Sequence, residues 1–384
     1  MSRAGLGRVS DYMRSEVSAG RIPGAILLIQ QHGKPVFYGK FGLRNVNAAQ
    51  PMTDETIFRL YSMSKPVTSV AAMMLVEDGK LGLDDAVANF IPAFADVKVG
   101  VQQPDGKLSL APLGRPITVR DLLRHTSGIT YGFYGDSSVR RLYAQAGLFD
   151  GDPDNATFVD RLARLPLAEQ PATRWDYGHS TDVLGRVIEV ASGQSLYGFE
   201  KARLLDPLSM HDTTFFVADD SRRPLIAQPL PGDWFGQPVA GITEANAPRG
   251  WESGGAGMVG TMGDYARFAQ MLLNGGELDG RRYLKRETIA QMTSDQIGEG
   301  TGVAKDPEFY FPGEDSGFGL GFAMRTVANG PLPAGEYRWD GVGGTFFFID
   351  PADDMFVICM MQSPSQRGPI QTALKRLIYQ AMDR

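Results

Sequence analysis

The stretch Ser62-Met63-Ser64-Lys65-Pro66 stands between a short apolar run, residues 57–61, and a segment of helical periodicity that begins at Val67. A serine three positions before a lysine places a hydroxyl and an amine one helical turn apart on the same face. An amine in that position can accept the serine proton, which is one of the few ways to activate a serine without a histidine. The spacing therefore predicts Ser62 as a nucleophile and Lys65 as its base.

The residues after this stretch predict a buried helix. Apolar side chains recur at helical spacing, and Gly79 suits the C-terminal cap. Pro66 is tolerated only in a first helical turn, so Ser62 should lie at or just before the helix N-terminus. A residue before proline resists the α conformation, however, which leaves the alternative that Lys65 is the cap and Ser62 lies in a loop. In that case the spacing alone would not guarantee the pairing.

Both ends of the chain combine helix and strand patterns. Apolar periodicity predicts a first helix from Leu6 to about Gly20 and a closing helix from Ile370 to Ile378. Alternating or continuous apolar runs predict strands, which cover residues 25–30, 35–39, 321–325, 345–350 and 355–361. We therefore expect the two ends to share one antiparallel sheet, with the residues between them inserted.

The middle of the chain is mainly helical, with long connections rich in proline and glycine. Ser180 or Thr181 is expected to cap a helix that Gly193 closes, and residues 224–251 are expected to form a loop over a pocket. The predicted fold class is α+β, an α/β sandwich whose antiparallel sheet is flanked by N- and C-terminal helices. The predicted domains are residues 1–60 with 252–384, and a mainly helical domain of residues 61–251, with the active site at their interface.

Composition restricts the classes of function. The chain has 384 residues, 43% of them hydrophobic, enough for a large buried core, and a formal charge of −6. The acidic balance without a basic stretch argues against nucleic-acid and anionic-membrane partners. No apolar segment predicts a signal peptide or a membrane span, so a soluble cytoplasmic protein is expected. The single cysteine, Cys359, lies in an apolar run and is interpreted as a small buried hydrophobe.

Three weaker motifs do not predict a cofactor or a metal. Residues 255–260 spell the dinucleotide fingerprint but follow no strand, so a tight glycine turn is the better interpretation. Residues 178–182 resemble a nucleophile elbow but end in Asp182 instead of glycine and also follow no strand. The four histidines have no ligand spacing. A Ser-His-Asp triad would need His125 or His179, for which there is no positive indication.

Two further elements strengthen the Ser62–Lys65 prediction. Tyr177 directly precedes the start of a predicted helix, and Trp339-Asp340-Gly341 precedes a predicted strand. With Ser62-x-x-Lys65, residues 122–129 (Leu-Leu-Arg-His-Thr-Ser-Gly-Ile) and the glycine turn of residues 253–258, they resemble the serine β-lactamase-like, penicillin-recognising family. The resemblance covers nearly the whole chain and is strongest to the family VIII carboxylesterases, which look like class C β-lactamases but hydrolyse carboxylic esters.

The resemblance implies a role for each matching residue. It implies Ser62 as the acylated nucleophile, Lys65 as its activating base and Tyr177 as partner base or proton relay. The backbone N–H groups of Ser62 and Val342 would form the oxyanion hole. Lysine chemistry agrees, because burial or a nearby positive charge must lower the lysine pKa before the amine can accept a proton.

Departures from the lactamase pattern favour esters over lactams. Trp339 stands where a β-lactamase has the lysine that faces the antibiotic carboxylate, and an indole offers an apolar wall to an uncharged substrate. Arg338 would point to the opposite face if this run is a strand. His179 replaces the lactamase asparagine and Asp340 the glycine common in the esterases. The remaining predicted substrate contacts are Gly341, Tyr131 and Phe133, of which the two aromatic residues could equally be core side chains.

The sequence therefore predicts a serine carboxylesterase that hydrolyses short to medium acyl esters through an acyl-enzyme, with a small-molecule ester as partner and no cofactor. An acyltransferase of the same fold shares the first half-reaction and remains an alternative. A β-lactamase or D,D-peptidase is disfavoured by Trp339. A non-catalytic binding protein is disfavoured because Ser62, Lys65 and Tyr177 are all present. The oligomeric state is not predicted.

Overall fold

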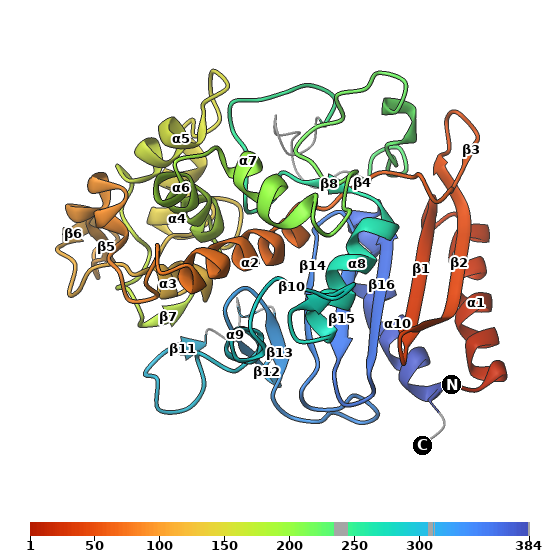
Figure 1. The fold of residues 1–384 in the computed structure, drawn as a ribbon. Helices are drawn as coiled ribbons and strands as arrows, with labels where there is room; N and C mark the ends of the chain where they lie inside the picture. The colour runs from red at the N-terminus through yellow and green to blue at the C-terminus, as the bar shows by residue number, and fades with distance from the viewer. Residues whose placement is uncertain (234–244, 306–309, 311, 383–384) are drawn as a thin grey trace.

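The computed structural model of the protein describes residues 1–233, 245–305, 310 and 312–382 and is built on one eight-stranded sheet (Figure 1). Every neighbouring pair in the sheet is antiparallel. In spatial order its strands are β12 (Ser316–Phe318), β13 (Ala323–Arg325), β14 (Tyr337–Asp340), β15 (Phe346–Asp350), β16 (Met355–Met361), β1 (Gly24–Gln31), β2 (Lys34–Asn45) and β3 (Gln50–Pro51). The N-terminal strand β1 pairs with the C-terminal strand β16, so the two ends of the chain share the sheet.

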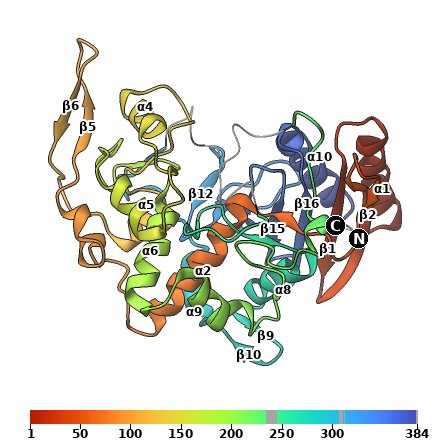
Figure 2. The ribbon, with the colours of Figure 1, turned by 90° about the horizontal axis from the view of Figure 1, so that it is seen from above.

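Alternation along the strands buries both faces of the sheet. Phe347 and Phe348, neighbours on β15, point to opposite sides. The Phe348 ring stacks on Tyr379 of α10 (Arg367–Gln380), and the Phe347 ring contacts Tyr265 of α8 (Met262–Leu273). Helix α1 (Arg3–Ser18) covers the same face as α10 (Figures 1 and 2). The predicted α+β sandwich with flanking terminal helices is confirmed.

The helical part lies beside the sheet and is centred on α2 (Ser64–Glu77), which is buried from Ser64 to Leu75 (Figure 1). The other helices around it are α3 (Val119–Leu123), α4 (Ser138–Gln145), α5 (Asn155–Leu162), α6 (Ser180–Ser192) and α7 (Leu196–Glu200). A small hairpin of β5 (Val99–Gln102) and β6 (Leu108–Ala111) projects from this part (Figure 2). The predicted boundaries at residues 61 and 251 stay a prediction.

Short pairings and one further helix complete the described elements. Strand β4 (Phe58–Arg59), just before Ser62, pairs with β8 (Val259–Gly260). The others are β7 (Arg174–Trp175), β11 (Ala304–Lys305), β9 (Glu277–Leu278), β10 (Arg281–Arg282) and α9 (Arg286–Met292). The β4–β8 pair anchors the chain that enters the Ser62 motif beside the glycine turn of residues 253–258.

Helix α6 begins differently from the prediction. The prediction that Ser180 or Thr181 caps α6 is wrong: the cap residue is His179, and Ser180 is the first helical residue. The Ser180 hydroxyl lies instead 2.9 Å from the Ser127 hydroxyl, a tertiary contact between two fully buried side chains.

Of the loop predicted over residues 224–251, residues 234–244 lie outside the described part of the chain. No helix in the described ranges is long and apolar enough to cross a membrane.

Candidate active site

Ser62 lies in a 3₁₀ turn, Tyr61–Met63, that runs directly into α2. Lys65 and Pro66 are the second and third residues of α2, where the missing proline N–H has no helical partner to lose. The alternative with Ser62 in a loop and Lys65 as the cap is therefore wrong, because Met63 occupies the cap position. Helical geometry holds the Ser62 Oγ 3.2 Å from the Lys65 Nζ.

The Lys65 amine is enclosed by oxygen atoms and aromatic rings. Its Nζ lies 2.7 Å from the Gly255 carbonyl oxygen, 3.2 Å from the Tyr131 hydroxyl and 4.6 Å from the centre of the Tyr177 ring. The side chain is 1% exposed, and this burial lowers the pKa of Lys65 to about 7, against the opposing charge of Asp182. At neutral pH a large share of Lys65 is an uncharged amine that can accept a proton.

Tyr177 approaches the nucleophile from the other side. Its hydroxyl donates a hydrogen bond to the Ser62 Oγ over 2.7 Å. Burial raises the pKa of Tyr177 well above its ordinary value, so the side chain rests as a neutral phenol. The Ser62 Oγ thus has a proton donor in Tyr177 and a proton acceptor in Lys65. Such an arrangement can deprotonate the serine on attack and return a proton to a leaving group.

The glycine turn of residues 253–258 takes part in the site through its backbone. The buried Asp182 accepts hydrogen bonds from the Ser253 hydroxyl (2.6 Å) and the Gly255 N–H (3.1 Å), and pairs with the His179 Nδ1 over 2.9 Å. This carboxylate fixes the turn that aims the Gly255 carbonyl at Lys65. Sequence reasoning assigned no role to Asp182 or to the Gly255 carbonyl. The one available signal was His179 and Asp182 at i, i+3 in the first turn of a helix.

The segment Trp339–Gly344 packs against the chain that enters Ser62. Added Cβ atoms at Gly341 and Gly343 would lie 2.3 Å from the Leu60 oxygen and 2.4 Å from the Tyr61 ring, so only glycine permits this approach. The turn therefore brings the Val342 backbone next to the segment of the nucleophile. Trp339 is buried, and its ring centre lies 5.5 Å from that of Tyr177.

The other predicted substrate contacts differ in their surroundings. Tyr131 is buried against Lys65, whereas Phe133, stacked on it at 4.7 Å, is 56% exposed. Both oxygens of Asp340 accept from the Arg367 guanidinium, over 2.7 and 2.8 Å. Asp340 is thus held by α10, and its contact with a substrate stays a prediction. Arg338 does point away from Trp339: its Nη2 bonds the Pro312 carbonyl and the Ser316 hydroxyl.

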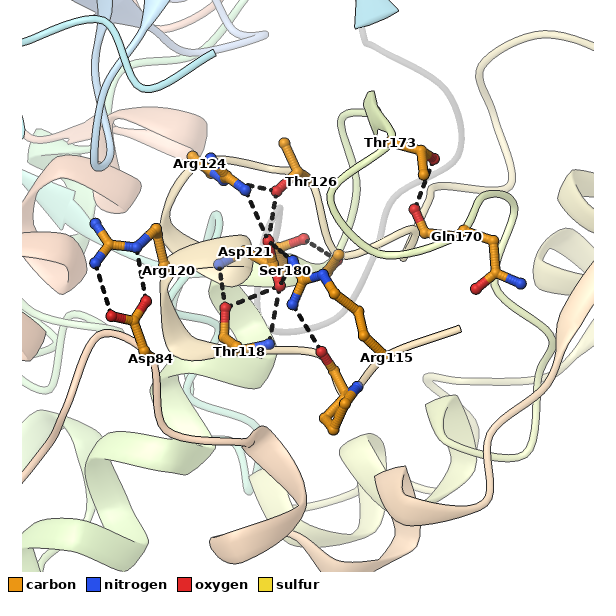
Figure 3. Close-up of polar contacts among 12 residues, drawn as sticks. Asp84, Arg115, Thr118, Arg120, Asp121, Arg124, Thr126, Gln170, Thr173 and Ser180 are labelled. Carbon is orange, nitrogen blue, oxygen red and sulfur yellow. Dashed lines mark hydrogen bonds and ion pairs between the residues drawn. The ribbon is translucent and has the colours of Figure 1, made fainter. Parts of the chain in front are cut away.

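A buried carboxylate organises the segment of residues 122–129 (Figure 3). Asp121, at 0% exposure, binds Arg115 through both oxygens (2.7 and 2.6 Å) and pairs with Arg124 at 3.2 Å. It also accepts from the Thr118 backbone N–H and hydroxyl, in a capping box at the start of α3, and from the Thr126 hydroxyl. These bonds fix the loop that follows α3.

That loop supports Tyr177. The His125 carbonyl accepts from the Asp176 N–H over 2.9 Å, and the His125 ring lies 4.9 Å from the Tyr177 ring. His125 is buried and neutral, since burial lowers its pKa well below the ordinary value. It acts as packing for Tyr177, and the motif of residues 122–129 therefore serves to position the phenol.

Replacing Asp121 with asparagine should destabilise the protein by about 3 kcal/mol, because two arginines lose a buried partner charge. Asp84→Asn is the matched control, since Asp84 forms an exposed pair with Arg120 (Figure 3) worth below about 1 kcal/mol. Thermal unfolding of both variants measures the difference. Equal melting temperatures for the two variants would contradict the role of Asp121.

The two phenols near Lys65 should contribute unequally to catalysis. Tyr177→Phe removes the phenol that donates to the Ser62 Oγ, so we expect kcat/KM on an ester to fall by about 10²- to 10³-fold. Tyr131→Phe removes a hydrogen bond to Lys65 and leaves the Tyr177 bond to Ser62 in place, so it should lower kcat/KM by less than about tenfold. Initial rates of both variants test this difference, and a larger loss for Tyr131→Phe would exchange the two roles.

Within the described ranges no three His, Cys, Asp or Glu side chains are grouped to hold a metal ion. Cys359 is fully buried on β16, as expected for a small hydrophobe, and burial raises its pKa to about 12.

Comparison with known proteins identifies the family of the chain. The sequence profile of the beta-lactamase family matches residues 9–380. Esterase EstB of Burkholderia gladioli is 31% identical over 94% of this chain and 91% of its own. Protein Rv1367c of Mycobacterium tuberculosis (strain H37Rv) is 34% identical over 91% and 88%. The solved structure of EstCE1, described as a hydrolase with promiscuous acyltransferase activity, is 26% identical, with a TM-score of 0.80 over 98% of this chain and 99% of that one. The chain therefore belongs to the beta-lactamase family and, within it, to the beta-lactamase-like esterases.

Proposed function

We propose that the protein is a serine hydrolase that cleaves carboxylic esters of short to medium acyl chains through an acyl-enzyme on Ser62. The observation that carries the proposal is the position of the Ser62 Oγ between a lysine whose pKa is about 7 and a neutral phenol. The esterase named among the relatives and the hydrolase among the solved structures support it. The partner is then a small-molecule ester.

The first half-reaction follows from these positions. The Ser62 Oγ attacks the ester carbonyl carbon while its proton passes to the neutral Lys65 amine. The carbonyl oxygen becomes an oxyanion, for which the backbone N–H groups of Ser62 and Val342 are the proposed donors. When the carbon–oxygen bond to the alcohol breaks, the leaving oxygen takes a proton through Tyr177, which Lys65 replenishes. The acyl group then remains as an ester on Ser62.

The second half-reaction returns the enzyme to its starting state. A water molecule attacks the acyl carbon, its proton passes to the Lys65–Tyr177 pair, and the Ser62 oxygen recovers a proton as the acid leaves. An alcohol in place of water would give acyl transfer. This second candidate is favoured by EstCE1, which is described as a hydrolase with promiscuous acyltransferase activity. Lactam hydrolysis is disfavoured, because Trp339 and Tyr177 present an aromatic surface where a lactam carboxylate needs a cation.

A substrate panel tests the proposal. The protein is incubated with p-nitrophenyl esters of increasing chain length and with a chromogenic cephalosporin, while colour release and intact mass are followed. We expect rapid turnover of the shorter esters, a transient mass increase of one acyl group and little cephalosporin turnover. Cephalosporin turnover without ester turnover would overturn the proposal. Adding a series of alcohols and measuring the ratio of transfer product to free acid separates the acyltransferase from the hydrolase.

A further inference from the structure

A cavity lies between α10 and strands β13 and β14. Its volume is about 530 Å³, and its walls include Ala323, Arg325, Arg338, Arg367, Gln371 and Lys375. Arg338 alternates along β14 with Tyr337 and Trp339, which belong to the main core. The cavity therefore opens mainly on the α10 side of the sheet. It adjoins the proposed active site through Trp339 and Asp340, which are among its lining residues.

The walls of this cavity are cationic, although the chain as a whole is acidic. Four basic side chains line it, Arg325, Arg338, Arg367 and Lys375, and among the lining residues that the structure describes Asp340 is the one acidic residue. Asp315 pairs with Arg325 from outside the lining, and the fully buried Glu336 is shared between Lys375 and Arg338. One carboxylate shared by two cations leaves the cluster short of negative charge.

In two of these guanidinium groups one nitrogen atom has no hydrogen-bond acceptor. Among the residues that the structure describes, the buried Arg325 Nε and Arg338 Nη1 have no hydrogen-bond partner. The Arg338 Nη1 lies 3.6 Å from Glu336, which is an ion-pair distance longer than a hydrogen bond. The Arg325 side chain is 7% exposed and that of Arg338 is 11% exposed. Buried cationic donors without acceptors are costly. The same two arginines line the cavity, where the accessible part of each guanidinium group can bind an anion.

The first turn of α10 adds to the positive electrostatic potential in the cavity. Arg367 and Gly368 line the cavity, the side chain of the cap residue Gln366 makes no capping bond, and no acidic residue lies in this turn. The place of a Cβ at Gly368 is open space. Helix N-termini attract anions through their unpaired N–H groups and dipole. The N-terminus of α10 therefore favours an anion in the same cavity as the arginine and lysine side chains.

We propose that this cavity binds a small oxyanion, the phosphate or carboxylate group of a small molecule. Planar guanidinium groups suit such ligands, because they donate two parallel hydrogen bonds to two oxygens. Burial lowers the pKa of Lys375 to about 7, with Arg338 and Arg325 adding to the effect against Glu336. A bound anion would keep this amine charged.

The test places a carboxylate in the cavity without removing a buried cation. Gln371→Glu changes a half-buried lining residue of α10, and Gln380→Glu makes the same change at an exposed position of α10 away from the cavity. Inorganic phosphate is titrated into the full-length protein by calorimetry, with ionic strength held constant by chloride. We expect saturable one-to-one binding to the wild type and to Gln380→Glu, and at least tenfold weaker binding to Gln371→Glu.

Three results would overturn the proposal: no saturable phosphate binding by the wild type, equal binding by Gln371→Glu, or equal loss in both variants. Thermal unfolding of each variant without phosphate verifies that the fold is retained. Because no ester is needed, this titration decides the anion site even if the proposed hydrolase activity is absent.

A second measurement, which rests on the proposed function, identifies the source of the oxyanion. The wild type and Gln371→Glu are compared on p-nitrophenyl butyrate and on the p-nitrophenyl monoester of glutaric acid, which carries a free carboxylate. A selective rise of KM for the glutarate monoester in Gln371→Glu would assign the anion to the substrate. An unchanged ratio, together with weakened phosphate binding, would assign it to a separate ligand.

Discussion

Ser62→Ala should lower ester turnover by at least about 10³-fold, because it removes the hydroxyl on which the proposed acyl-enzyme forms. The Ser62 Oγ is the atom on which Lys65 and Tyr177 converge, at 3.2 and 2.7 Å. The variant should also lose the mass increase that the wild type shows with a slowly hydrolysed ester. Initial rates with p-nitrophenyl esters and intact mass spectrometry measure both effects.

Ser64→Ala is the matched control for this prediction. Ser64 lies two residues away in the same motif, but its hydroxyl accepts from the Met258 N–H over 3.1 Å and is not directed at Lys65. We expect this variant to lose some stability through the unpaired Met258 N–H and to keep its turnover within about tenfold of the wild type. Unchanged activity in Ser62→Ala, or loss of acylation only in Ser64→Ala, would remove Ser62 as the proposed nucleophile.

The local part of the site could be predicted from the sequence. Serine and lysine at i, i+3 before a periodic helix predict their own distance, and strand alternation predicts that Arg338 points away from Trp339. The pairing of the chain ends in one sheet followed from apolar runs near both termini. The predictions for Ser62, Lys65 and Arg338 succeed because each depends on neighbours within a few residues.

The support of the site could not be predicted in this way. Asp182 reaches Gly255 and Asp340 reaches Arg367 only because the fold brings distant segments together. Ser180 was mistaken for a helix cap because its hydroxyl has a tertiary partner, Ser127, that no local pattern reveals. The glycine turn of residues 253–258 was interpreted as structural, although its Gly255 carbonyl binds the lysine amine. Side chains that hold a catalytic group in place carry no local signature of their own.

The second large effect concerns Lys65. If its neutral amine accepts the Ser62 proton, kcat/KM should fall about tenfold for each pH unit below about 7 and level off above it, because protonation removes the base. The direction follows from the lowered pKa, since an unperturbed lysine would place this limb near its ordinary value of 10.5. A pH–rate profile with an ester whose leaving group is monitored at a pH-independent wavelength measures it. A profile flat through pH 7 would contradict the assignment.

Lys65→Met should lower kcat/KM by about 10³-fold and abolish the limb near pH 7, because methionine fills the buried space without offering a base. Lys80→Met, at an exposed lysine just after α2, should leave both unchanged. Lys65→Arg separates two explanations, since a guanidinium keeps the positive charge but does not give up its proton at these pH values. Loss of activity in both Lys65 variants indicates that the amine works as a base. Activity retained by Lys65→Arg alone would mean that positive charge beside the Ser62 oxygen suffices, and Tyr177 would then have to carry the proton.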